Sequence, residues 1–132
     1  GQPTGVGVSG DISGTGQGAR AIWVSNPNLP KAQRTMTRWF NTEAITRPPN
    51  GTWGNLGRNV LVGPGLNNWD LALSKNFKVR EGVRLQFRSE FFDAFNHPQF
   101  SGVSATYGSG NYGYVTGARA PRIIQLGLRL TF

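Results

Sequence analysis

The last eleven residues of the chain, Arg122 to Phe132, limit the fold more than any other stretch. Every second position is apolar and the positions between are polar or glycine, the apolar ones being Ile124, Leu126, Leu128, Leu130 and Phe132. A period of two is typical of a β-strand with one apolar and one polar face. A strand of about ten residues is long enough to cross a bilayer at a tilt. A surface strand of a soluble sheet shows the same alternation, so both interpretations stay open here.

A second alternating region, residues 66–96, is predicted to form a β-hairpin. Its first arm alternates around Trp69, Leu71 and Leu73, with an expected slip in the alternation before Phe77. A tight turn follows at Arg80-Glu81-Gly82. The return arm has Val83, Leu85, Phe87, Ser89 and Phe91 on one face and Arg84, Gln86, Arg88 and Glu90 on the other. Each arm therefore approaches the length that a membrane strand needs.

Composition favours strands and turns over helices. The chain of 132 residues has 19 Gly and 8 Pro, and only 15% of its residues are charged. We predict one all-β domain over 1–132, an antiparallel meander of about five or six strands with long loops. Its segments are a Gly-rich stretch with a short strand (1–30), a long loop (31–65), the hairpin (66–96), and a loop, a short strand and the terminal strand (97–132). Such a sheet is a partial barrel or an open sheet that other strands or other copies complete.

Catalytic and cofactor sites are poorly supported by the sequence. The single histidine, His97, precedes Pro98 at a strand end, where a loop or interface role is the simpler interpretation. Gly5 to Gly10 matches G-x-G-x-x-G, but the strand, helix and acidic residue that a dinucleotide site requires are missing. There is no cysteine and no zinc-ligand spacing. We expect no enzyme activity, no cofactor and no metal site.

The charge of the chain is strongly positive. Lys and Arg number 14 against 6 Asp and Glu, which gives a net charge of +8 and attraction to anionic surfaces. The predicted polar face of the sheet carries Asp70, Arg84, Arg88, Glu90 and Arg129. Cross-strand ion pairs are the simpler expectation for this face; a surface that meets an anionic solute is the functional alternative. Because the aromatic residues lie on the opposite face from the arginines, specific nucleic-acid binding is not expected.

Several motifs in order resemble the carboxyl-terminal end of TonB-dependent transporter-like outer-membrane barrels, most closely the Oar-like group, whose members have a carboxypeptidase-regulatory-like domain at the amino end. The matching stretches are Arg38–Asn41, Gly57–Gly65, Asn68–Phe77, Arg84–Phe92, Phe95–Pro98 and Arg122–Phe132. The resemblance implies a location in the outer membrane or on the extracellular surface of a Gram-negative-type bacterium. It also implies that the terminal strand resembles the signal by which such barrels are recognised for insertion.

The resemblance is incomplete, because transporters of this kind have about 22 strands and a plug. Since the chain begins at Gly1 in a Gly-rich run, we expect it to be a processed product or a piece of something longer. As an isolated chain it is expected to pair its open strand edges with other copies, as an oligomer or filament. The residues expected in strand pairing and assembly are Trp69, Leu71, Leu73, Leu85, Phe87, Phe91, Arg122, Ile124, Leu126, Leu128, Leu130 and Phe132.

Two alternatives to self-assembly remain. In the first, the chain is the terminal segment of an intact transporter barrel and its partner is the rest of that barrel, with outer-membrane lipid or lipopolysaccharide against the apolar face. In the second, it is a basic nucleic-acid-binding module, whose affinity would fall steeply with salt.

Overall fold

The computed structural model describes all residues from Gly1 to Phe132, which form two compact units. Unit 1 comprises Gly1–Leu66 and Phe100–Ala118; unit 2 comprises Asn67–Gln99 and Arg119–Phe132. The chain is all-β apart from two short 3-10 helices, η1 (Lys31–Gln33) and η2 (Thr42–Ala44). One strand pair is parallel, the other pairs are antiparallel, and no sheet closes into a barrel. The predicted fold class is therefore confirmed.

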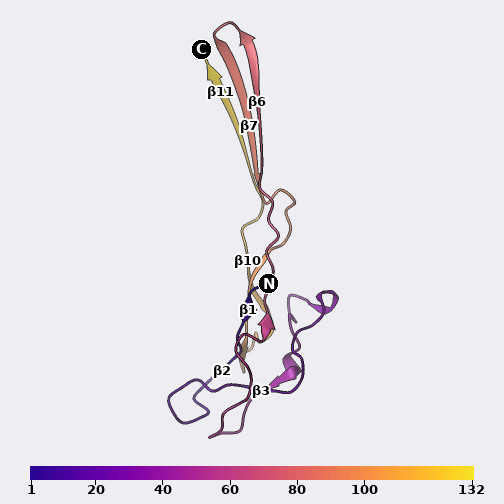
Figure 1. Ribbon diagram of the computed structural model, residues 1–132, viewed down its shortest axis with the longest axis vertical. Helices are drawn as coiled ribbons and strands as arrows, with labels where there is room; N and C mark the ends of the chain where they lie inside the picture. Colours follow the sequence, from indigo (N-terminus) through magenta and orange to yellow (C-terminus); the bar gives the residue numbers. More distant parts are fainter. The chain divides into compact units, whose positions relative to one another are not determined.

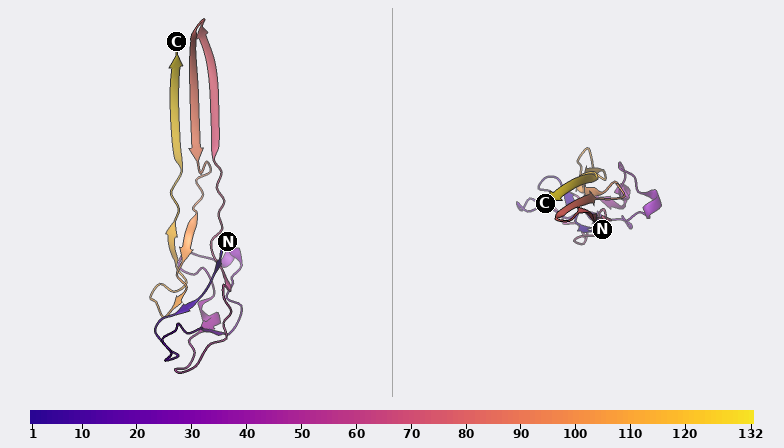
Figure 2. Two further views of the ribbon diagram at one scale, coloured as in Figure 1. Left: turned by 60° about the vertical axis from the view of Figure 1, so that its left-hand side comes forward. Right: turned by 90° about the horizontal axis from the view of Figure 1, so that it is seen from above.

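Unit 2 is built on the three long strands of the chain. They are β6 (Leu71–Arg80), β7 (Val83–Phe92) and β11 (Ile123–Thr131), and they pair antiparallel in the order β11-β7-β6. Figure 1 and the left view of Figure 2 show the three strands side by side, with the C terminus at the same end as the β6–β7 turn. The central strand, β7, is paired on both sides, whereas β6 and β11 each have one unpaired edge.

The turn between β6 and β7 is short, as predicted. It consists of Glu81 and Gly82, and Gly82 has a φ of 78°, a conformation that costs glycine little. The predicted slip before Phe77 is wrong, because the register runs without interruption from Leu71 to Lys78. The register shifts later, between Lys78 and Arg80, next to the turn.

Unit 1 is held together by short strand pairs. Its strands are β1 (Pro3–Thr4), β2 (Gly7–Val8), β3 (Ile22–Trp23), β4 (Ile45–Thr46), β5 (Leu61–Val62), β8 (Phe100–Val103), β9 (Thr106–Tyr107) and β10 (Val115–Ala118). They pair as β1–β5, β2–β9, β3–β4 and β10–β8. The β2–β9 pair joins the amino-terminal stretch to residues about one hundred positions later in the chain, so unit 1 is assembled from two distant segments.

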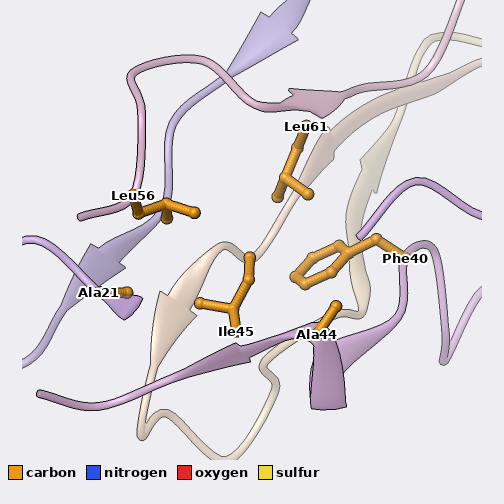
Figure 3. Packing of buried hydrophobic residues seen from close by; sticks show 6 residues of the cluster. All are labelled: Ala21, Phe40, Ala44, Ile45, Leu56 and Leu61. Atoms are coloured by element: carbon orange, nitrogen blue, oxygen red, sulfur yellow. The ribbon is translucent and has the colours of Figure 1, made fainter. Parts of the chain in front are cut away.

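The core of unit 1 lies largely within residues 31–65, which the sequence predicted to be a long loop. Phe40 is 1% exposed, and its side chain lies with those of Ile45 and Leu61 in the cluster of Figure 3. The other fully buried members of this cluster are Ala21, Ala44 and Leu56. Tyr112 packs edge-on against Phe40, with ring centroids 5.2 Å apart. In this segment single side chains are buried in the core, and no long strand buries one whole face. The sequence therefore shows no alternation of apolar and polar residues.

Residues 99–111 also differ from their prediction as a polar loop. They contain β8 and β9, and the Trp39 indole contacts Phe100 edge-on at 5.9 Å between centroids. The Trp39 Nε1–H donates to the carbonyl oxygen of Val62 at 3.0 Å. Both long connections are therefore ordered by strand pairing and side-chain contacts, and they are not irregular loops. None of the helices is long and apolar enough to span a membrane.

Candidate functional site

The β-ladder of unit 2 separates apolar from polar side chains onto two faces. Residues directly opposite one another in antiparallel strands share a face, so the register assigns each side chain. The rows of the apolar face, written β6, β7, β11, are Leu71–Phe91–Ile124, Leu73–Ser89–Leu126, Lys75–Phe87–Leu128 and Phe77–Leu85–Leu130. Nine of the predicted pairing residues thus meet on one face. Trp69 lies two residues before β6, Arg122 directly precedes β11, and Phe132 follows β11.

This apolar face is uncovered. Leu126 and Leu128 are 69% and 70% exposed, and Leu73 and Val79 are similarly open. Its large hydrophobic side chains extend along the whole length of β6 and β11, and Phe132 at the chain end is 95% exposed. Contiguous apolar surface of this extent marks a contact with lipid or with protein.

Two residues interrupt the apolar face. Ser89 is buried between Leu73 and Leu126, and Lys75 stands beside Phe87 on the edge strand β6. The Lys75 ammonium lies 6.0 Å from the centroid of the Phe77 ring, within the range of a cation–π contact. The lysine is the one charged side chain in the four rows of this face.

The opposite face carries the predicted polar residues Arg84, Arg88, Glu90 and Arg129. Arg88 and Glu90 form an ion pair along β7, and it is the single salt bridge of the chain. The expected pairing of Asp70 with arginines across the hairpin is wrong, because Asp70 lies one residue before the ladder begins. Its Oδ1 instead accepts hydrogen bonds from the Asp93 N–H and the Asn68 Nδ2, each at 3.0 Å.

Asp70 belongs to a polar cluster at one end of the strands that the sequence analysis missed. Gln99 donates through Nε2 to Asn68 Oδ1 at 3.3 Å, and the Arg122 N–H donates to Asn96 Oδ1 at 3.3 Å. Asp93 and Asn96 have positive φ values of 52° and 51°, which aspartate and asparagine tolerate better than other residues. The density of Asn and Asp around both strand ends was the available signal. The cluster connects the start of β6, the end of β7 and the approach to β11.

A cationic hollow lies at the other end of the polar face. It has a volume of about 380 Å³, and its polar lining consists of Asn76, Lys78, Arg84, Gln86, Arg129 and Thr131. Lys78 lies directly opposite Arg84 in the ladder. Arg84 in turn lies opposite Thr131, which places Arg129 diagonally from it. No carboxylate lines the hollow.

Unit 1 has a separate aromatic hollow of about 460 Å³, lined by Tyr107 and Tyr112 together with Glu43 and Ser109. The two tyrosine rings meet edge-on, with centroids 5.4 Å apart. Burial raises the pKa of Tyr112 to about 12, with a smaller contribution from Tyr107. The Tyr112 hydroxyl is buried and has no hydrogen-bond partner.

Asp11 organises the Gly-rich loop of unit 1. Its carboxylate accepts the N–H groups of Gly16 at 2.8 Å and Gly14 at 2.9 Å, and the Ser13 hydroxyl at 3.0 Å. The Gly16 N–H has the largest effect and lowers the pKa of Asp11 below 3.8. Asp11 therefore has a structural role in this turn.

The G-x-G-x-x-G stretch and His97 are the remaining site candidates from the sequence. No group of three or more His, Cys, Asp or Glu side chains could hold a metal ion. The G-x-G-x-x-G stretch runs through β2 and is followed by bends rather than by a helix. The His97 ring lies 6.0 Å from the Phe95 ring, and Phe95 in turn meets Trp69 edge-on at 6.3 Å.

Comparison with protein families gives one match. The sheet of unit 2, with one apolar and one polar face, agrees with that match. The model of the outer membrane beta barrel domain matches residues 1–125. The chain belongs to this family. Comparisons with curated proteins and with solved structures gave no match. As a member of the outer membrane beta barrel domain family, the chain is a barrel-type protein of the outer membrane of a Gram-negative-type cell.

The strands of this barrel domain have the dimensions that such barrels use. β6 and β7 are ten residues long and β11 is nine. At about 3.3 Å per residue and a tilt of about 40°, a ten-residue strand crosses about 25 Å, the height of the apolar band of an outer-membrane barrel. The match covers all of unit 1, β6, β7 and the first three residues of β11, so unit 1 is part of the same barrel domain.

Proposed function

We propose that β6, β7 and β11 are membrane-crossing strands in the wall of a solute-conducting outer-membrane barrel of the TonB-dependent transporter-like, Oar-like kind. The observation that carries this proposal is the three-stranded sheet with one continuous apolar face and one polar face. The apolar face turns toward lipid and the polar face toward the barrel interior, as alternation requires in such barrels. The proposed role is conduction of solute and not catalysis.

The lengths of the connections between the strands indicate which end of the barrel lies on the periplasmic side. Outer-membrane barrels have short turns on the periplasmic side and longer loops outside. Glu81-Gly82 is the short turn, whereas residues 93–122 join β7 to β11 at the opposite strand ends. We infer that the turn and Phe132 lie on the periplasmic side. The two segments of unit 1 then belong to the external connections.

Aromatic residues at the strand ends support the same placement. Trp69 precedes β6 and is 57% exposed, and its Nε1–H donates to Asn67 Oδ1 at 3.0 Å. Trp69 packs against Phe95, just beyond β7. Aromatic side chains with a polar handle concentrate where the bilayer meets water. Phe77 and Phe132 supply aromatic rings toward the opposite end.

Spin-label accessibility in the complete protein tests this proposal. Single cysteines replace Leu126 and Leu128 on one face and Gln125 and Arg129 on the other, and the chain offers no cysteine to interfere. After reconstitution in lipid vesicles, labels at 126 and 128 are expected to collide with oxygen, and labels at 125 and 129 with a water-soluble nickel chelate. Equal accessibility on the two faces, or protection of 126 and 128 from oxygen, would contradict the lipid-facing assignment.

A second candidate function follows from the unpaired edges of β6 and β11. Unpaired edges of nine- and ten-residue strands are templates for another chain. The 132-residue chain expressed alone would then add strand to strand into an oligomer or filament, with the apolar face against protein. Electron microscopy and light scattering in detergent-free buffer test it. Rings or fibres support self-assembly, and a monodisperse monomer contradicts it.

A further inference from the structure

The cationic hollow on the polar face has a charge arrangement that no ion pair within the chain relieves. Lys78 and Arg84 are direct cross-strand neighbours, and like charges in this position destabilise a sheet. The single salt bridge of the chain uses Arg88 and Glu90, neither of which lines the hollow. Three cations therefore surround the hollow without a carboxylate.

The uncharged lining adds hydrogen-bonding groups between these cations. Asn76, Gln86 and Arg129 form one row across the three strands, and Lys78, Arg84 and Thr131 form the next. Amide and hydroxyl groups both donate and accept, so they can complete the shell of an anion that the cations hold. Arginine binds carboxylate and phosphate oxygens with two parallel hydrogen bonds.

The spacing of the cations favours an anion with several charged groups. Direct cross-strand neighbours have Cβ atoms about 5 Å apart and diagonal ones about 7–8 Å apart. Lys78 to Arg84 is a direct step and Arg84 to Arg129 a diagonal one. A single carboxylate can contact only two neighbouring cations, whereas a compact molecule with two or three anionic groups reaches all three. A volume of about 380 Å³ accommodates such a molecule.

We propose that this hollow binds a small polyanionic solute, a polycarboxylate or a polyphosphate, through Lys78, Arg84 and Arg129. The proposal rests on the proposed solute-conducting function, since it names the class of solute that meets the interior face. Binding would also relieve the repulsion between Lys78 and Arg84. The anion would therefore stabilise the folded sheet by mass action, more strongly as the anion concentration rises above its Kd.

Calorimetric titration of the complete protein in detergent micelles tests the proposal, with citrate and tripolyphosphate as the two probes and sucrose as the neutral comparison. We expect binding of at least one anion, an affinity that falls with added salt, and none for sucrose. Arg84→Gln and Arg129→Gln are each expected to weaken binding by about tenfold or more, the range of one charge-assisted hydrogen bond. Binding of citrate alone identifies a polycarboxylate site, and binding of tripolyphosphate alone a polyphosphate site.

Arg122→Gln is the matched control, because it removes one exposed positive charge from the same unit outside the hollow. It is expected to bind the anion like the wild type, and Arg129→Lys to retain binding within a few fold. Equal loss in Arg122→Gln and Arg129→Gln, or no binding by the wild type, overturns the proposal. Conductance of the same protein in planar bilayers is measured separately, so a conducting barrel that binds no anion refutes this inference alone, whereas a non-conducting protein refutes the proposed function.

Discussion

The backbone N–H of Asp93 donates a hydrogen bond to Asp70 Oδ1 at 3.0 Å, which closes the open end of the β6–β7 hairpin. A second bond, from the Ala94 N–H to the Trp69 carbonyl at 2.8 Å, lies beside it. Together they fix the left-handed turn at Asp93 to the residues that enter β6. These two hydrogen bonds, which we call the clasp, explain why Asp70 precedes β6 without an arginine partner.

Removing the Asp70 acceptor is expected to destabilise this end of the hairpin. Asp70→Ala leaves the N–H of Asp93, a buried residue, without its partner and should lower the free energy of unfolding by about 1–3 kcal/mol. Asp70→Asn is the matched control, because its Oδ1 can still accept the bond. Hydrogen exchange at the Asp93 amide in the complete protein measures the effect. Unchanged protection in Asp70→Ala would show that the clasp contributes nothing.

Gly54 is expected to tolerate no side chain. A Cβ there would collide with the carbonyl oxygens of Arg20 and Ala21, and the Ala21 oxygen also accepts the Leu56 N–H at 2.9 Å. Because backbone atoms cannot give way as a flexible side chain does, Gly54→Ala should destabilise unit 1 by about 3 kcal/mol. Gly18→Ala is the control, since its Cβ meets nothing within 4 Å. Exchange of the Leu56 amide reports the difference; equal protection in the two variants would contradict the clash.

The long strands were predictable from sequence and unit 1 was not, for a physical reason. Alternation over nine or ten residues is a local signal, so β6, β7 and β11 appeared near their observed bounds. Two-residue strands such as β2 and β9 carry no period, and their pairing joins residues about one hundred positions apart. The role of Asp70 likewise depends on Asp93, whose turn conformation no local pattern specifies.

The Tyr112 hydroxyl provides a test of burial in unit 1. Its pKa is about 12 in the folded chain against 10.0 for an ordinary tyrosine, so the unfolded chain loses this proton first as pH rises. Stability therefore does not depend on this proton below pH 10, and it falls between pH 10 and 12. Tyrosinate absorbance in a pH titration should show one late transition, absent in Tyr112→Phe and retained in Tyr114→Phe. A single transition of all tyrosines near pH 10 would refute the assignment.

Tyr112→Phe is also expected to increase stability. The hydroxyl is buried without a partner, and an unsatisfied buried polar group costs about 1–3 kcal/mol. Its removal leaves the edge-on contacts with Phe40 and Tyr107 in place. Urea unfolding should therefore shift to higher concentration by the equivalent of about 1 kcal/mol. A loss of stability would show that the hydroxyl is hydrogen-bonded to ordered water.

Lys75 provides the sharpest test of which medium covers the apolar face. It stands between Leu73 and Phe77 along β6, and its ammonium lies over the Phe77 ring. On a lipid-facing strand a lysine near the bilayer centre costs about 2–4 kcal/mol, less where its chain reaches toward the interface. Lys75→Leu should therefore stabilise the complete protein in lipid vesicles against urea by about 1–2 kcal/mol.

Ser74→Leu, which places the same apolar side chain on the opposite face of the same strand, is the control for Lys75→Leu and should give no such gain in lipid. In the self-assembled chain the expectation for Lys75 reverses, because a lysine on an edge strand opposes further pairing. There Lys75→Leu should accelerate fibre growth measured by light scattering. If Lys75→Leu instead destabilises the protein in vesicles, the ammonium has a carboxylate partner on the strand that pairs with the free edge of β6, and an acidic-residue scan of that strand would locate it.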